Sequence, residues 1–348
     1  MAIYTYDPSV VYLSSGIPTF YISTASESAK VSLYRSDNCI FETRMYAQNY
    51  RLTVRDLRQV IEQDMRDNYL TFAAYTLYTD DDTVVSKFNV LYCCMKFTGD
   101  NKQFLVNRFL TTSTSKQMAR VKDELYFFVR KEEGVIAPRQ FVTYKDATGN
   151  ILLHDKQFFT RPGASGYGGV FCVEVKPNDY ASLGTVLSIT TMVGARSFTH
   201  FYIEQQPSLK LFYANIFNVP EQVHLIGVTT RKTEVERSEA VIHSTTSFYD
   251  QTTTELREFE SAPMPKAAAD MIGEIVASHM VNIIDQDYED WDDLPTILIT
   301  DSSVEVKDAK GELNTVKLTF RYEDDSPHLP LFTETELPFN NVYSLPYL

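Results

Sequence analysis

Short runs in which apolar and polar residues alternate cover most of this 348-residue chain. A period of two predicts β-strands that bury one face, and clusters of Gly, Asn, Asp and Ser between the runs predict turns. The 22 Tyr and 22 Phe, against one Trp, favour sheet as well, because these side chains suit a pleated surface. The predicted strands cover residues 19–23, 30–34, 39–46, 70–78, 86–97, 125–130, 136–144, 151–153, 171–175, 186–193, 198–204, 211–217, 223–230, 239–248, 279–284, 296–300, 304–306 and 315–322.

The pattern changes to a helical period at residues 53–67. Apolar residues recur there at spacings of three and four, and charged residues fall on the other side. Thr53, with Asp56 three residues later, resembles a capping box, and Asn68 follows as a stop signal. The apolar positions are Val54, Leu57, Val60, Ile61 and Met65.

A second helical period covers residues 263–278. Ser261 is the predicted cap, and Pro265 suits a first helical turn. A lone helix between strands usually covers a sheet face, so we expect an architectural role for it. The apolar positions are Ala268, Met271, Ile272, Ile275 and Val276.

These elements predict a mainly β fold of tandem antiparallel β-sandwich modules with two short amphipathic helices. We predict domains over residues 1–100, 101–206 and 207–348, with 99–102 as turn or linker material after the first. Because proline cannot donate to a ladder, we expect residues 326–348 to form an extended tail. Its prolines are Pro327, Pro330, Pro338 and Pro346.

The charge balance argues against nucleic acid as a partner. Lys plus Arg number 32 and Asp plus Glu number 46, a net charge of −14, and such a field repels a phosphate backbone and anionic lipid surfaces. The first ten residues lack a basic region followed by a long apolar run, and no segment has the roughly 18–20 apolar residues of a membrane helix. We therefore expect a soluble product of the cytoplasm without membrane insertion.

The cysteines do not have the spacing of a disulfide framework. Cys39, Cys93, Cys94 and Cys172 read as buried free thiols, a pattern typical of a reducing compartment. Cys93 and Cys94 are adjacent, so on a strand they would face opposite sides.

Candidate chemistry is sparse, and we predict no catalytic, cofactor-binding or metal-ligating residues. The six histidines stand singly, without a His-Glu-x-x-His pair, and no Gly-x-Ser-x-Gly elbow occurs. The Gly-dense residues 162–169 lack the Lys-Ser or Lys-Thr of a phosphate loop, so a turn is favoured. A glycosidase with two carboxylates stays open as a remote alternative, because pairing across a cleft is a spatial fact.

The acidic segment 285–293 is the sharpest charge cluster. Asp285, Asp287 and Glu289 have the spacing that begins a calcium loop, but the sixth position is not Gly and the twelfth, Thr296, is not Glu. A solvated loop is favoured, and calcium binding stays open. Trp291 in the same segment leaves open stacking on a sugar or an interface contact.

The third domain carries a resemblance. Its order is residues 211–221 (LFYANIFNVPE), a strand ending in Gly227, the helix with Ser278-His279-Met280-Val281, and then residues 295–301 (PTILITD). This order resembles tail-associated virion proteins of tailed bacteriophages, particularly those of Bacteroidetes-type hosts. Ile40-Phe41-Glu42 and the first helix are similar to their N-terminal β-sandwich units. The resemblance implies a distal tail or baseplate subunit and supplies no catalytic residues.

The leading hypothesis is therefore a virion structural protein, not an enzyme. It would be a tail, baseplate or tail-connector subunit that forms a ring with copies of itself and contacts neighbouring tail proteins. The alternative is a receptor- or carbohydrate-binding, adhesin-like protein that holds a host-surface glycan. Exposed aromatic residues motivate it, with Tyr167, Tyr288 and Trp291 as the candidates.

Overall fold

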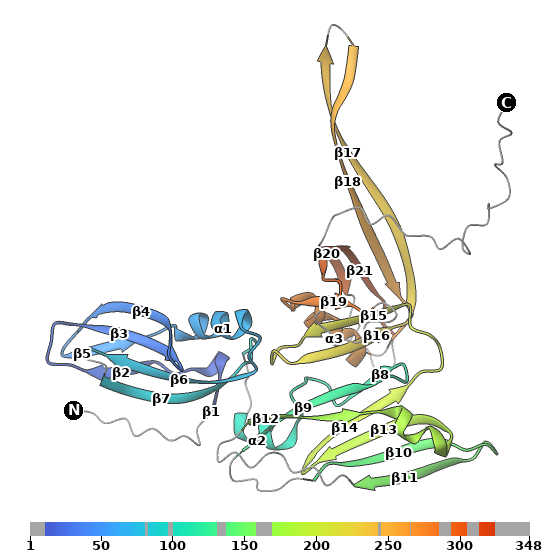
Figure 1. Cartoon of the computed structure of the whole chain (residues 1–348), viewed down its shortest axis with the longest axis horizontal. Helices are drawn as coiled ribbons and strands as arrows, with labels where there is room; N and C mark the ends of the chain where they lie inside the picture. The colour runs from blue at the N-terminus through green and yellow to red at the C-terminus, as the bar shows by residue number, and fades with distance from the viewer. Residues whose placement is uncertain are drawn as a thin grey trace, which may run out of the picture.

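The computed structural model describes residues 11–80, 83–96, 100–130, 137–157, 169–242, 245–264, 266–284, 294–304 and 313–323. The fold is mainly β, as predicted, with sandwich-like modules along the chain. Figure 1 shows the sheets of the first, second and third parts of the chain as separate bodies around a common centre.

The first module has a five-stranded sheet in the order β1-β7-β6-β3-β4 beside the pair β2-β5. Helix α1 (Leu57–Asp67) packs its apolar side into the core, where Ile61 and Met65 are fully buried with Val31 and Leu77. The strands are β1 (Val11–Leu13), β2 (Phe20–Ser23), β3 (Ser28–Arg35), β4 (Asn38–Tyr46), β5 (Arg51–Val54), β6 (Phe72–Thr79) and β7 (Thr83–Leu91).

The second module is a sandwich of the sheet β11-β10-β13-β14-β8 and the pair β12-β9. Phe127, Val142, Ile189 and Phe198 fill the core between the two layers. A 3₁₀ segment, η3 (Pro177–Leu183), closes one side. The other elements are α2 (Asn101–Asn107), β8 (Ser115–Met118), β9 (Asp123–Val129), β10 (Arg139–Lys145), β11 (Ile151–Gln157), β12 (Gly169–Val175), β13 (Thr185–Val193) and β14 (Arg196–Tyr202).

The third module packs α3 (Lys266–Ala277) against two sheets, β16-β15-β19 and β17-β18-β21-β20. Ile272 and Ile275 of α3 are fully buried against Leu211, Tyr213 and Val316, so the predicted architectural role of this helix is confirmed. The strands are β15 (Leu209–Ala214), β16 (Pro220–Leu225), β17 (Gly227–Ile242), β18 (Thr245–Ser261), β19 (Val281–Ile283), β20 (Ile297–Val304) and β21 (Val316–Tyr322).

A long two-stranded ribbon leaves the third module. β17 and β18 pair along 16 and 17 residues, but β18 meets β21 only from Arg257 to Glu260. In Figure 1 the ribbon projects away from the rest of the molecule. We call this pair of strands the ribbon below.

Both predicted helix caps are wrong. Thr53 lies in β5, and α1 begins after Asp56, whose φ of 59° is left-handed and whose side chain makes no capping bond. Ser261 ends β18, and its hydroxyl accepts a hydrogen bond from the Val316 backbone N–H at 2.9 Å. Both residues therefore belong to the strands that precede the helices.

The predicted turn at 99–102 is also wrong in part. Residues 101–107 form α2, and the Asp100 carboxylate caps it by accepting from the Lys102 N–H at 2.8 Å. Two strand predictions change as well: residues 223–230 split into β16 and β17, and 239–248 belong to both arms of the ribbon. Two edge pairs, β1 with β7 and β14 with β8, are parallel and not antiparallel.

Candidate functional site

A turn of five residues, Asn215 to Val219 between β15 and β16, contacts all three modules. The Asn215 side-chain oxygen accepts from the backbone N–H of Phe217 at 2.9 Å, which closes the turn. Its side-chain nitrogen donates to the Leu110 carbonyl of the second module at 2.8 Å and to Glu221 at 2.9 Å. The sequence predicted a strand through residue 217, so this turn was missed.

Asn218 makes the contact with the first module. Its φ of 55° is left-handed, a conformation that asparagine tolerates better than most residues. The side-chain nitrogen donates to the carbonyls of Met65 at 3.2 Å and Leu70 at 3.1 Å, and the Thr71 hydroxyl donates to the Asn218 carbonyl at 2.9 Å. The turn is thus hydrogen-bonded to the C-terminal end of α1 and to the segment that follows it.

An apolar cluster surrounds the same turn. Phe217 and Val219 are buried among residues of the first and second modules, and the Phe217 ring stacks on Phe104 at 5.5 Å between centroids. The first module contributes Leu13, Leu91 and Cys93, and the second contributes Leu105, Leu110 and Phe128. We call the turn and this cluster the three-module junction.

A buried ionic cluster joins the second and third modules. The Lys116 ammonium lies 2.6 Å from Asp123 Oδ2 and donates to the Gln222 carbonyl of β16 at 3.2 Å. His200 Nε2 lies 2.8 Å from the same Asp123 oxygen, and all these side chains are buried. The cluster could not be predicted from the sequence, because Lys116 and Asp123 meet His200 and Gln222 only after strands 77 to 106 residues further along the chain fold against them.

The charge states in this cluster follow from burial and pairing. Burial raises the pKa of Asp123, but Lys116 and the His200 hydrogen bond together hold that pKa well below its usual value. Burial lowers the pKa of His200 against the opposing effect of Asp123. Neutral His200 therefore donates its Nε2 proton to an ionised Asp123, which is also paired with Lys116. The three side chains form a hydrogen-bonded ion pair that is buried from solvent.

His224 lies beside this cluster on β16. The Ala119 backbone N–H donates to His224 Nδ1 at 2.9 Å, so the neutral ring carries its proton on Nε2. Burial lowers the pKa of His224 to about 4, with Lys116 adding to the effect. Two of the six scattered histidines, His200 and His224, are thus buried together at the boundary between the second and third modules.

The cysteines are free, as predicted, but only one is buried. Cys93 is buried, whereas the predicted burial is wrong for Cys39, Cys94 and Cys172, which are exposed. The hydroxyl of Ser14 donates to the Cys93 carbonyl, and burial raises the pKa of the Cys93 thiol to about 11. This thiol is a packing residue of the three-module junction.

Several sequence-predicted features fall outside the described residues. These are the acidic segment with Asp285, Asp287, Glu289 and Trp291, most of the Gly-dense segment, and the tail beyond residue 323. In the part of the chain that the structure describes, no group of three or more His, Cys, Asp and Glu side chains is placed to hold a metal ion.

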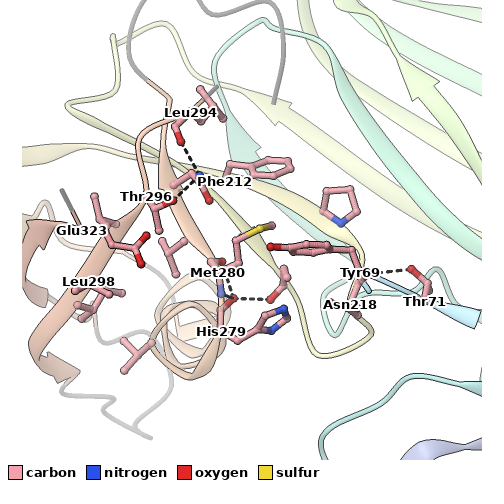
Figure 2. A pocket seen from close by; sticks show the side chains of 18 residues that line it. Tyr69, Thr71, Phe212, Asn218, His279, Met280, Leu294, Thr296, Leu298 and Glu323 are labelled. Atoms are coloured by element: carbon pink, nitrogen blue, oxygen red, sulfur yellow. Dashed lines mark hydrogen bonds between the residues drawn. The ribbon is translucent and has the colours of Figure 1, made fainter. Parts of the chain in front are cut away.

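A groove of about 780 Å³ opens beside the junction, between the first and third modules (Figure 2). Its wall on the first module is the segment after α1, with Tyr69 and Thr71. On the third module, β15, β19 and β20 and the end of β21 contribute. Tyr69 and Met280 line this groove together with Asn282 and Glu323.

The comparisons with known proteins define no family. No family model matches the chain, and no curated protein does. Among solved structures, the calcium binding domain CBD12 of CALX1.1 overlaps 54% of this chain and 77% of that chain, with 9% identity and a TM-score of 0.14. A likeness at that score carries no argument. Across the described residues, the helices are too short or too polar to cross a membrane.

Proposed function

We propose that this chain is a structural subunit of a phage virion, in the tail, baseplate or tail connector. It forms a ring with copies of itself and contacts neighbouring tail proteins. The order of elements in the third module supports the virion part of the proposal, through the resemblance described above. The ribbon is the observation that carries the assembly part.

The ribbon has little support within its own chain. β17 is exposed from Val228 to Arg237, and among the described strands none pairs with the ribbon between Arg257 and its tip. A two-stranded hairpin is marginally stable in water, and its unpaired edges offer hydrogen bonds to another strand. A neighbouring subunit that covers the ribbon would remove both problems.

Charged side chains keep such an edge from aggregating before assembly. Lys232 lies 2.8 Å from Glu234 on the same strand, and Arg231 lies 3.8 Å from Glu255 across the pair. Exposed charges of both signs on an edge strand disfavour unspecific pairing of strands. The same charges still allow the ribbon to dock on a neighbouring subunit whose surface carries the complementary charges. Contacts of this kind between different surfaces of identical subunits can close a ring.

Shortening the ribbon tests this function. Replacing residues 234–254 by Asn-Gly joins Thr233 to Glu255, which already face each other, through a turn suited to a two-residue hairpin. We expect the shortened chain to keep its melting temperature and remain a monomer, while the full chain forms a defined oligomer in native mass spectrometry. The full chain should also occur in purified virions.

Two results would contradict the proposal. One is a full chain that stays monomeric at high concentration and is absent from virions. The other is an oligomer that is unchanged by the shortening. As a matched control, the exposed pair Arg139 and Asp155, on β10 and β11 of the second module, is replaced by Ser, which should leave assembly intact.

A further inference from the structure

Tyr69 occupies a position that usually belongs to glycine. The Leu70 N–H donates to the Met65 carbonyl at 2.8 Å and the Tyr69 N–H donates to the Arg66 carbonyl at 3.1 Å, which is the Schellman pattern at the end of α1. The residue between the cap and Leu70 must be left-handed, and Tyr69 has a φ of 52°. A bulky side chain there is strained, since its Cβ crowds the backbone.

The strained side chain gains little from packing. Tyr69 is 68% exposed. Figure 2 shows its ring extending into the groove toward Met280, so the ring forms part of the groove wall. Strained residues cluster at binding and catalytic sites, and this one lines a groove.

The opposite wall holds a buried acceptor without a donor. Asn282 is 7% exposed, and its side-chain nitrogen donates to the Leu294 carbonyl at 2.8 Å and to the Thr296 hydroxyl at 3.4 Å. These two bonds fix the orientation of the amide, and its Oδ1 then has no partner among the described residues. Buried acceptors in folded proteins are nearly always paired, and a donor from a ligand or a bound water would complete this one.

Glu323 adds a second acceptor to the same groove. It lies where β21 ends, held by its backbone N–H, which donates to the Thr296 carbonyl at 3.0 Å. Figure 2 shows its carboxylate turned toward the groove. The groove therefore combines an exposed aromatic side chain with two acceptors, and a fitting ligand presents hydrogen-bond donors beside an apolar face.

We propose that this groove binds a carbohydrate, with Tyr69 as the stacking platform and Asn282 and Glu323 as acceptors for sugar hydroxyls. A sugar ring has C–H groups on one face, which pack on an aromatic ring, and hydroxyl donors around its rim. The volume of about 780 Å³ is in the range of small-ligand pockets. This inference is independent of the ribbon and of the assembly proposed above.

Replacing Tyr69 by glycine separates binding from folding. Glycine relieves the left-handed strain, so we expect Tyr69→Gly to unfold at the same temperature or about 2 °C higher. Removal of the platform should weaken sugar binding at least ten-fold. Glu323→Gln should weaken it less, because the amide oxygen still accepts one hydrogen bond.

Tyr50 provides a matched control. It is 76% exposed with a φ of 61° in the turn between β4 and β5, and it does not line the groove. Tyr50→Gly should give the same relief of strain and leave sugar binding unchanged. A binding loss in both variants would show that the effect is not specific to the groove and would overturn the proposal.

The full chain is screened on a glycan array and then by ligand-observed NMR with millimolar glucose, galactose, mannose, N-acetylglucosamine and sialic acid. A lysine-rich peptide serves as a second probe, because ammonium groups are donors too. Binding of at least one sugar that Tyr69→Gly weakens at least ten-fold supports the proposal. Failure to bind any sugar, binding of the peptide alone, or unchanged sugar binding by Tyr69→Gly overturns it.

Discussion

At the scale of single residues, Glu274 is a carboxylate in a place that disfavours its charge. It lies on α3, where the Thr112 hydroxyl of the second module donates to one oxygen, and the other oxygen is buried without a partner among the described residues. Burial raises the pKa of Glu274 to about 7, against the opposing effect of the Thr112 bond. Because the folded state holds this proton more tightly than the unfolded chain, Glu274 costs stability once the pH exceeds its unfolded pKa.

Replacing Glu274 by Gln should remove that dependence. The wild-type protein is expected to lose up to about 3 kcal/mol relative to Glu274→Gln as the pH rises from below 4.5 to above 7. Urea unfolding of both proteins at pH 4.5, 6 and 8 measures the difference. A constant gap between the two proteins across this range would show that Glu274 has an ordinary pKa.

At the scale of elements, the helices and strands that bury one apolar face could be predicted from the sequence, and those that do not were missed. α1 and α3 were predicted because each buries an apolar stripe against a sheet. α2 was missed because it has seven residues and only Leu105 is fully buried. The ribbon was missed because both faces of its β17 strand meet solvent from Val228 to Arg237, so no apolar alternation marks it.

The buried stripe of α3 gives a prediction at this scale. Ile272 and Ile275 are fully buried against strands of both sheets of the third module. Replacing both by Asp places two charges in an apolar core, so we expect loss of the cooperative unfolding transition of that module. Circular dichroism and limited proteolysis detect the loss.

A matched change on the exposed side of the same helix serves as the control. Ala277 is exposed on α3, and Ala277→Asp is expected to change stability by less than about 1 kcal/mol. A native-like transition in the Ile272 and Ile275 double variant would mean that α3 is not part of the core.

At the scale of the whole molecule, two kinds of contact hold the modules together. The three-module junction combines hydrogen bonds from Asn215 and Asn218 with a shared apolar cluster. The buried ionic cluster adds a charged contact between the second and third modules only. Neither could be found from the sequence, because asparagines in a turn and single charges in strands acquire their roles only when distant strands meet.

Replacing Lys116 tests the ionic contact. Lys116→Met leaves the buried Asp123 carboxyl group without its cation, so we expect a loss of about 3–5 kcal/mol. Lys122→Met is the control, since Lys122 makes ion pairs of similar length at the surface and should cost less than about 1 kcal/mol. Equal losses of unfolding free energy in the two variants, measured with urea, would show that the buried Lys116 pair contributes no more to stability than the surface pairs of Lys122.

Substitutions at the two ends of the ribbon should have different effects, because one end is packed against the third module and the other projects into solvent. At about 3.3 Å per residue, the 16 residues of β17 span roughly 50 Å, whereas a 100-residue domain has a radius of gyration of about 13 Å. Near Gly227 the ribbon is tightly packed, because a Cβ there would lie 2.2 Å from the Glu260 carbonyl. Farther out, from Val228 to Arg237, side chains face solvent. Substitutions near Gly227 should therefore be restricted because they disturb the folding of the chain itself. Substitutions from Val228 to Arg237 should be restricted only where the ribbon contacts another molecule.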